Sequence, residues 1–112
     1  MTILPDIESE FCGIYVTHWE VPRFVIEVGR RFWGLLPVRE RWAAHFPSDF
    51  QLPNEENQTI SMRHRPARFF QIRFIGTPSN HGHFAHMGFC HRKVEIHRIQ
   101  EILEIKNPGY TW

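Results

Sequence analysis

The chain has 112 residues, of which 42% are hydrophobic and 22% charged, and this is the composition of one folded domain. Its formal charge of +1 excludes the gross excess of basic residues that many polyanion-binding proteins carry. No apolar run approaches the length that spans a bilayer, and the N-terminus lacks the pattern of a signal peptide. We therefore expect a single soluble domain over residues 1–112, located in the cytoplasm and without a membrane partner.

The first third of the chain predicts β structure. Residues 11–21 have a β-rich composition in which both faces carry apolar side chains. Pro22 interrupts this segment and residues 23–28 resume it, which predicts a bend or bulge there. Gly29 predicts the end of that strand, and an aromatic and aliphatic block follows at residues 32–36. Cys12 and Cys90 each fall in an expected strand, so we predict buried thiols at both positions.

The middle of the chain predicts the only helix. Val38, Trp42 and Phe46 recur every four residues, charged residues fill the gaps, and Pro37 suits a first helical turn. This pattern predicts a short amphipathic helix over residues 38–46. Residues 47–58 are polar and rich in turn formers, which predicts an exposed loop.

The second half predicts further strands. Residues 59–64 are a short strand candidate, and residues 67–75 alternate strictly, with Phe70, Ile72 and Phe74 on one face. Residues 89–105 alternate and then slip in phase, which favours a long bulged strand, with a helix over residues 96–105 as the alternative. The predicted fold is all-β, or β with one short helix. We expect its strands to form a small antiparallel β-barrel, and an OB-like barrel is one form of this architecture.

The most unusual segment is residues 80–92, which holds four of the eight histidines. If the segment is extended, His81 and His83 share one face, and a turn would bring His86 to them. These three residues are the candidate ligands of a divalent transition metal, and His18 or Glu20 could complete the site. The same imidazoles could instead cap turns or bond to backbone carbonyls. Since the usual metalloenzyme motifs are absent, we expect no cofactor and keep the metal as the alternative.

Two short segments resemble a known group. Residues 19–24 (WEVPRF) are similar to an aromatic-Glu-x-Ser-x-Phe strand, and residues 82–89 (GHFAHMGF) are similar to a G-[HY]-x-G-H-x-G-x motif. Both recur in a group of small bacterial β-domains of unassigned function, some of them carried by lipoproteins. The chain departs from the group's pattern at Pro22 and Ala85, where serine and glycine are usual. The resemblance implies a compact β-barrel and brings no known activity with it.

Sixteen aromatic residues are more than a core of this size must bury, which points to contacts outside the core. We predict a non-enzymatic module that binds a small molecule or a protein. The predicted ligand-binding residues are Trp19, Glu20, Arg23, His83 and His86. Arginine supplies 11 of the 13 basic residues and suits interfaces, and exposed strand edges invite pairing, so we favour a homodimer.

Two other functions stay open. A metal-dependent enzyme would use the histidine segment, with Glu20 as a ligand or a base. An OB-like nucleic-acid binder would use an arginine-rich face beside Phe69 and Phe70, although the low net charge makes nucleic acid an unexpected partner. The arginines of that face are Arg63, Arg65, Arg68 and Arg73.

Overall fold

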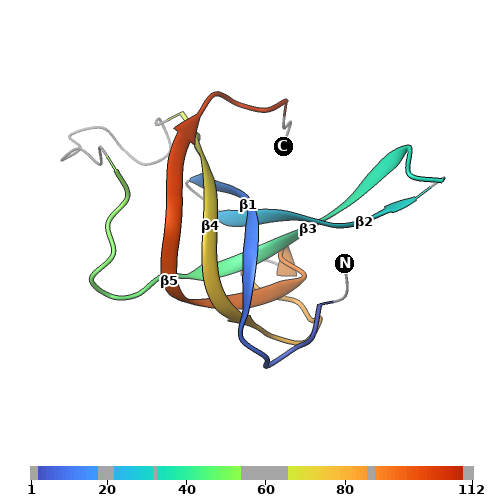
Figure 1. Ribbon diagram of the computed structural model, residues 1–112, viewed down its shortest axis with the longest axis horizontal. Coiled ribbons are helices and arrows are strands. Elements are labelled where there is room, and N and C mark those ends of the chain that lie inside the picture. The colour runs from blue at the N-terminus through green and yellow to red at the C-terminus, as the bar shows by residue number, and fades with distance from the viewer. Residues whose placement is uncertain (1–2, 18–21, 32, 54–65, 86–87, 110–112) are drawn as a thin grey trace.

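The protein forms a closed barrel of five strands in the computed structural model (Figure 1). The structure describes residues 3–17, 22–31, 33–53, 66–85 and 88–109. Within these ranges there is no long apolar helix of the kind that crosses a bilayer. The strands are β1 (Ser9–Thr17), β2 (Arg23–Arg31), β3 (Leu36–His45), β4 (Arg68–Pro78) and β5 (Arg92–Ile105).

The barrel has the strand order β1-β2-β3-β5-β4 and closes through the pairing of β4 with β1. Because β4 returns to lie beside β1, the first four strands form a Greek key. The predicted all-β barrel is confirmed, and a five-stranded Greek-key barrel is the architecture that OB folds also have. The prediction of a purely antiparallel sheet is wrong, because β5 runs parallel to β3 while the other neighbouring pairs are antiparallel.

Aromatic side chains fill the barrel interior. Phe70, Ile72 and Phe74 of β4 are all buried, as their alternation predicts. Trp42 of β3 is fully buried and meets Phe11 edge-on, with the ring centroids 5.1 Å apart. Edge-to-face packing is the favoured geometry for such pairs, because the positive ring edge meets the negative face.

The predicted helix over residues 38–46 is wrong, because most of this segment is strand β3. A spacing of four residues returns to one face of a helix, but it also returns to one face of a strand, whose period is two. The spacing of Val38 and Trp42 therefore could not separate the two structures, and pairing with β2 and β5 decided for the strand. Residues 96–105 are strand too, and the register shifts between β4 and β5 confirm the predicted bulges.

Three further predictions about the first third of the chain are wrong. β1 and β2 are antiparallel neighbours with Ile14 opposite Val25, so the chain reverses between them instead of bending within one strand. Gly29 does not end β2, which continues past a bulge to Arg31. Cys12 is exposed because the preceding residue, Phe11, points into the core, whereas Cys90 is buried as predicted. The predicted strand at residues 59–64 lies outside the described residues.

Two glycines permit the close approach of neighbouring strands. A Cβ atom on Gly13 of β1 would lie 2.4 Å from the carbonyl oxygen of Val25. A Cβ atom on Gly76 of β4 would lie 2.6 Å from the carbonyl oxygen of Glu95. Both positions therefore require glycine for the backbones to come together, as is typical where strands bend around a small barrel.

Candidate functional site

The histidine segment forms a small hairpin between β4 and β5. Phe84 and Cys90 exchange two backbone hydrogen bonds of 3.0 and 2.9 Å, and the Gly82 amide donates to the carbonyl of His91 at 2.9 Å. At its tip, the Gly88 amide donates to the carbonyl of Ala85 at 3.1 Å. Ala85 and Gly88 both have left-handed backbone conformations, with φ of 64° and 69°. Glycine tolerates such angles more readily than alanine.

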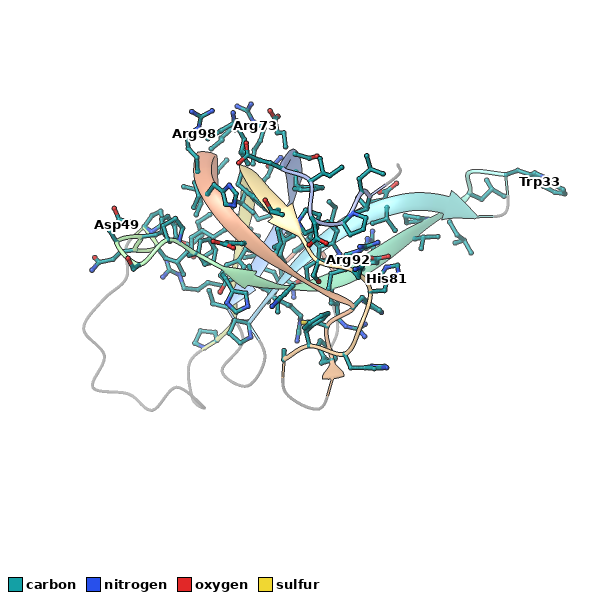
Figure 2. All side chains as sticks on the ribbon, turned by 90° about the horizontal axis from the view of Figure 1, so that it is seen from below. Trp33, Asp49, Arg73, His81, Arg92 and Arg98 are labelled. Carbon is teal, nitrogen blue, oxygen red and sulfur yellow. The ribbon has the colours of Figure 1, made fainter. Side chains whose placement is uncertain are left out.

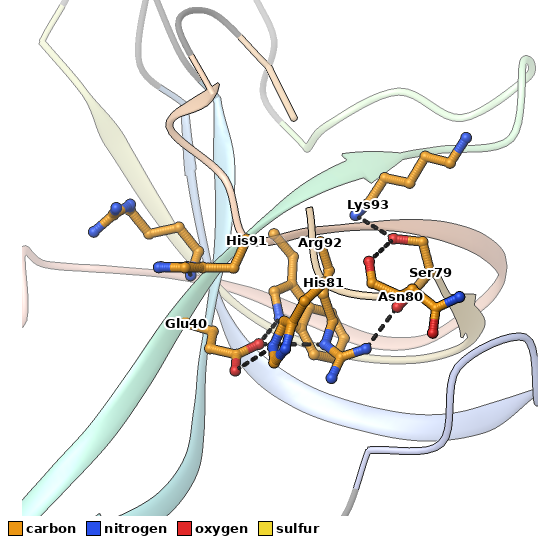
Figure 3. A network of polar contacts seen from close by, with 9 residues as sticks. Glu40, Ser79, Asn80, His81, His91, Arg92 and Lys93 are labelled. Carbon is orange, nitrogen blue, oxygen red and sulfur yellow. Dashed lines mark hydrogen bonds and ion pairs between the residues drawn. The ribbon is translucent and has the colours of Figure 1, made fainter. Parts of the chain in front are cut away.

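A half-buried carboxylate fastens this hairpin to the barrel (Figure 3). Glu40 of β3 accepts hydrogen bonds of 2.9 Å from the indole Nε1 of Trp42 and 2.9 Å from Nε2 of His81. Because a carboxylate can only accept, the His81 Nε2 atom carries the hydrogen. Arg92 pairs with Glu40 at 3.4 Å and donates to the carbonyl of Ser79 at 2.6 Å. Five groups, from β3, β5 and the segment that joins β4 to β5, therefore meet in one network.

The environment of Glu40 keeps its carboxylate ionised. Only 15% of its side chain is exposed, and this burial raises its pKa. The hydrogen bonds from Trp42 and His81 and the charge of Arg92 act in the opposite direction and prevail, so the pKa of Glu40 is lowered. A carboxylate of low basicity with fixed donors is a poor general acid or base near neutral pH. The network is therefore suited to holding the hairpin in place.

A second cluster lies around Phe89. The guanidinium carbon of Arg41 lies 4.1 Å from the Phe89 ring centroid, and that of Arg23 lies 4.8 Å from it. Arg41 also donates from Nε to the Phe89 carbonyl at 2.9 Å, while its amide donates to Nδ1 of His91 at 3.1 Å. Burial raises the pKa of the neighbouring Cys90 thiol, although both arginines oppose this. A protonated, buried thiol is not a nucleophile.

The structure brings together only part of the predicted ligand-binding set. Arg23 is buried beside Phe89, whereas His83 is exposed and its Cβ lies against Gly88. Trp19, Glu20 and His86 lie outside the described residues. Glu40 and Arg92 were missed, because nothing in the sequence shows that a charged residue on β3 points inwards.

The described residues do not form the predicted metal site. His81 bonds to Glu40, and no three potential ligands among the described residues lie close enough to hold a metal ion. The candidate set of His81, His83 and His86 includes one residue beyond the described part of the chain, so the metal site stays a prediction.

The predicted nucleic-acid face has its described arginines paired with carboxylates. Arg68 donates to both oxygens of Glu104 at 2.9 Å. Arg73 lies 3.1 Å from Glu101 and 3.6 Å from Glu10. Phe69 and Phe70 are buried and present no ring on which a base could stack. Arg63 and Arg65 fall outside the described ranges.

A surface groove of about 520 Å³ runs past the end of β3 and the start of β5. Asp6, His45, Lys93 and Glu95 line it with charges of both signs. Of the predicted ligand-binding residues that the structure describes, neither Arg23 nor His83 borders this groove. It is therefore a separate feature from the histidine segment.

The most prominent surface feature is the far part of the β2–β3 hairpin, which projects from the barrel (Figures 1 and 2). The residue pairs that join β2 to β1 reach Val25, and those that join β3 to β5 begin at Trp42. Beyond these residues the ladder joins β2 only to β3, for example at Gly29–Val38 and Arg31–Leu36. We call residues 29–38 the arm, and its end bears the labelled Trp33 in Figure 2.

The arm ends in exposed apolar side chains. Trp33 has a relative exposure of 102%, Leu35 of 76% and Leu36 of 53%. Trp33 and Gly34 form the turn with left-handed φ angles of 57° and 85°. The sequence showed this apolar block but not its exposure, because a buried strand end has the same composition.

These features define the class of molecule: a five-stranded OB-like barrel with a latched β4–β5 hairpin and a projecting, apolar-tipped arm. A scan against protein-family models found no match to the chain. Searches of curated proteins and of solved structures likewise found no significant match.

Proposed function

We propose that the protein is a non-enzymatic binding module in which the barrel is the scaffold and the arm makes the contact. The observation that carries the proposal is the full exposure of Trp33 at the end of the arm, with Leu35 and Leu36 beside it. Single exposed apolar residues are ordinary, but a contiguous apolar cluster at a projecting point is typical of an interaction site.

The arm lowers the stability of the folded protein, and this supports the same proposal. A two-stranded ribbon is only marginally stable in water without a third strand or a packing surface. A non-glycine residue in the left-handed region adds about 1–3 kcal/mol of strain, and Trp33 has this conformation. An element that destabilises the folded protein in both ways is best explained by a contact that it makes with another molecule.

The remaining features favour the scaffold role for the barrel. The pKa of Glu40 is lowered by its hydrogen-bond donors and that of the Cys90 thiol is raised by burial, which suits structural contacts better than proton transfer. A nucleic-acid binder of the predicted kind has less support, because Arg68 and Arg73 already pair with carboxylates.

Site-specific photo-crosslinking tests the proposal. A benzophenone amino acid replaces Leu35 in the arm or, as the matched control, the exposed Leu103 of β5. Each protein is irradiated in an extract of its own cells that retains membranes, and the crosslinked molecule is identified by mass spectrometry. We expect a defined product from position 35 that is absent from position 103. Equal products from both positions, or none from position 35, would overturn the proposal.

A further inference from the structure

We infer that the arm docks the protein on a membrane, and that its partner is the surface of an anionic phospholipid bilayer. This inference rests on the proposed function and names the partner of the same element. It departs from the expectation of no membrane partner. That expectation depended on the length of apolar runs, which decides whether a segment spans a bilayer but not whether a short tip enters its interface.

The charge of the arm complements an anionic surface. Residues 29–38 include Arg30 and Arg31 and no acidic residue, although the whole chain is nearly neutral at +1. Basic residues beside an apolar segment are attracted to phosphatidylserine-like or phosphatidylglycerol-like headgroups. The arm thus carries a local formal charge of +2.

The order of residues along the arm matches the layers of a bilayer interface. Trp33 follows Arg31 by two residues in the sequence and lies in the turn at the end of the arm. Amphipathic elements bury their apolar side to a depth of roughly 5–10 Å while their basic residues stay among the headgroups. Tryptophan is enriched at this level of the membrane because its ring is apolar and its N–H is polar.

The form of the tip favours lipid over other partners. The exposed Trp33, Leu35 and Leu36 lie at the end of a narrow ribbon, away from the barrel wall (Figure 2). A fluid bilayer accepts such a convex tip without a preformed pocket. Nucleic-acid bases stack on aromatic rings, and two exposed leucines add nothing to that contact. The two leucines therefore favour a lipid surface over a polynucleotide as the partner of the arm.

Vesicle co-sedimentation tests the inference on the full chain. The probes are vesicles of phosphatidylcholine alone and of phosphatidylcholine with an equal part of phosphatidylglycerol. We expect binding to the anionic vesicles, weakening as salt is raised, and weaker binding to the neutral ones. Trp33→Asn should lower the partition coefficient about tenfold, since a large apolar side chain is lost. Asparagine tolerates the left-handed angle, so the fold is retained.

Three variants define the contact. Trp33→Phe should keep binding and lose only the quenching of arm fluorescence by brominated lipid. Arg30→Gln combined with Arg31→Gln should weaken binding to anionic vesicles and remove most of its salt dependence. Leu103→Ala deletes an exposed leucine of the barrel and should bind like the wild type.

The outcomes separate this inference from the proposed function. Equal sedimentation of the wild type and Trp33→Asn, or no sedimentation at all, overturns the membrane partner. If a fluorescent single-stranded oligonucleotide binds through Trp33 instead, the partner is nucleic acid and the inference also fails. In either case a protein or nucleic-acid crosslink from position 35 would leave the proposed function standing. No crosslink from position 35 would remove both.

Discussion

The carboxylate of Glu40 accepts a hydrogen bond of 2.9 Å from the indole Nε1 of Trp42, two residues further along the same face of β3. Side chains two residues apart on a strand point to the same face, so the side chains of Glu40 and Trp42 both point toward one end of the barrel. The bond links the buried tryptophan to the partners of Glu40 on β5 and the β4–β5 hairpin. The strand that carries half of the arm is therefore fastened to the barrel at the base of the arm.

Replacing Glu40 by glutamine should lower stability in a pH-dependent way. At pH 7 we expect the free energy of unfolding to fall by about 1–3 kcal/mol, because Arg92 and Trp42 lose an ionised acceptor. The pKa of Glu40 is lowered in the folded protein, so its stabilisation is present above the unfolded pKa and is lost as pH falls through the lower folded value. The difference between the wild type and Glu40→Gln should therefore shrink below about pH 4.

Urea unfolding over a series of pH values measures this difference. Glu95→Gln is the control, because Glu95 is an exposed glutamate on β5 and its replacement should change stability by less than about 0.5 kcal/mol. A loss in Glu40→Gln that stays the same from pH 7 to pH 3 would show that the charge of Glu40 is not the cause.

Gly13 and Gly29 should respond to alanine in opposite directions. Gly13→Ala places a Cβ atom 2.4 Å from the Val25 carbonyl oxygen, so we expect a loss of about 1–3 kcal/mol as the strands separate. Gly29→Ala meets no atom within 4 Å and should stabilise by about 0.4–1 kcal/mol through the unfolded chain. Thermal unfolding followed by circular dichroism compares the two variants. Similar melting temperatures for both would contradict the close approach of β1 and β2.

The left-handed residues predict two stabilising substitutions. Trp33→Gly and Ala85→Gly remove side chains from φ angles of 57° and 64°, and each should raise the free energy of unfolding by up to about 1 kcal/mol. Ala43→Gly within β3 is the control and should lower stability by roughly 0.5–1 kcal/mol. Chemical denaturation measures the free energy of unfolding of each variant. If Ala85→Gly lowers it as much as Ala43→Gly does, residue 85 is not strained.

The two thiols should differ in reactivity. Cys12 is exposed on β1, while Cys90 is fully buried and burial raises its pKa. An aromatic disulfide reagent should therefore label Cys12 rapidly in the native protein and Cys90 only after unfolding. Cys12→Ser should abolish the fast phase, and Cys90→Ser should leave it intact. A fast phase that survives Cys12→Ser would place Cys90 within reach of solvent.

The amino-acid sequence alone determined the inner face of β4. Phe70, Ile72 and Phe74 alternate without ambiguity, because a period of two with aromatic and β-branched residues fits only a strand. The phase slip near Ile99 favoured a bulged strand there, although it left a helix over residues 96–105 open. These are local properties, and neighbouring residues are enough to specify them.

Only the tertiary structure decided the secondary structure in the first half of the chain and which residues meet in the candidate site. A four-residue spacing fits helix and strand alike, so pairing with β2 and β5 chose the strand for Val38 and Trp42. Glu40 became an anchor because Arg92 and His81, far away in sequence, converge on it. The exposure of Trp33 also depended on long-range pairing, because β1 and β5 turn away before the arm and leave its apolar tip in water.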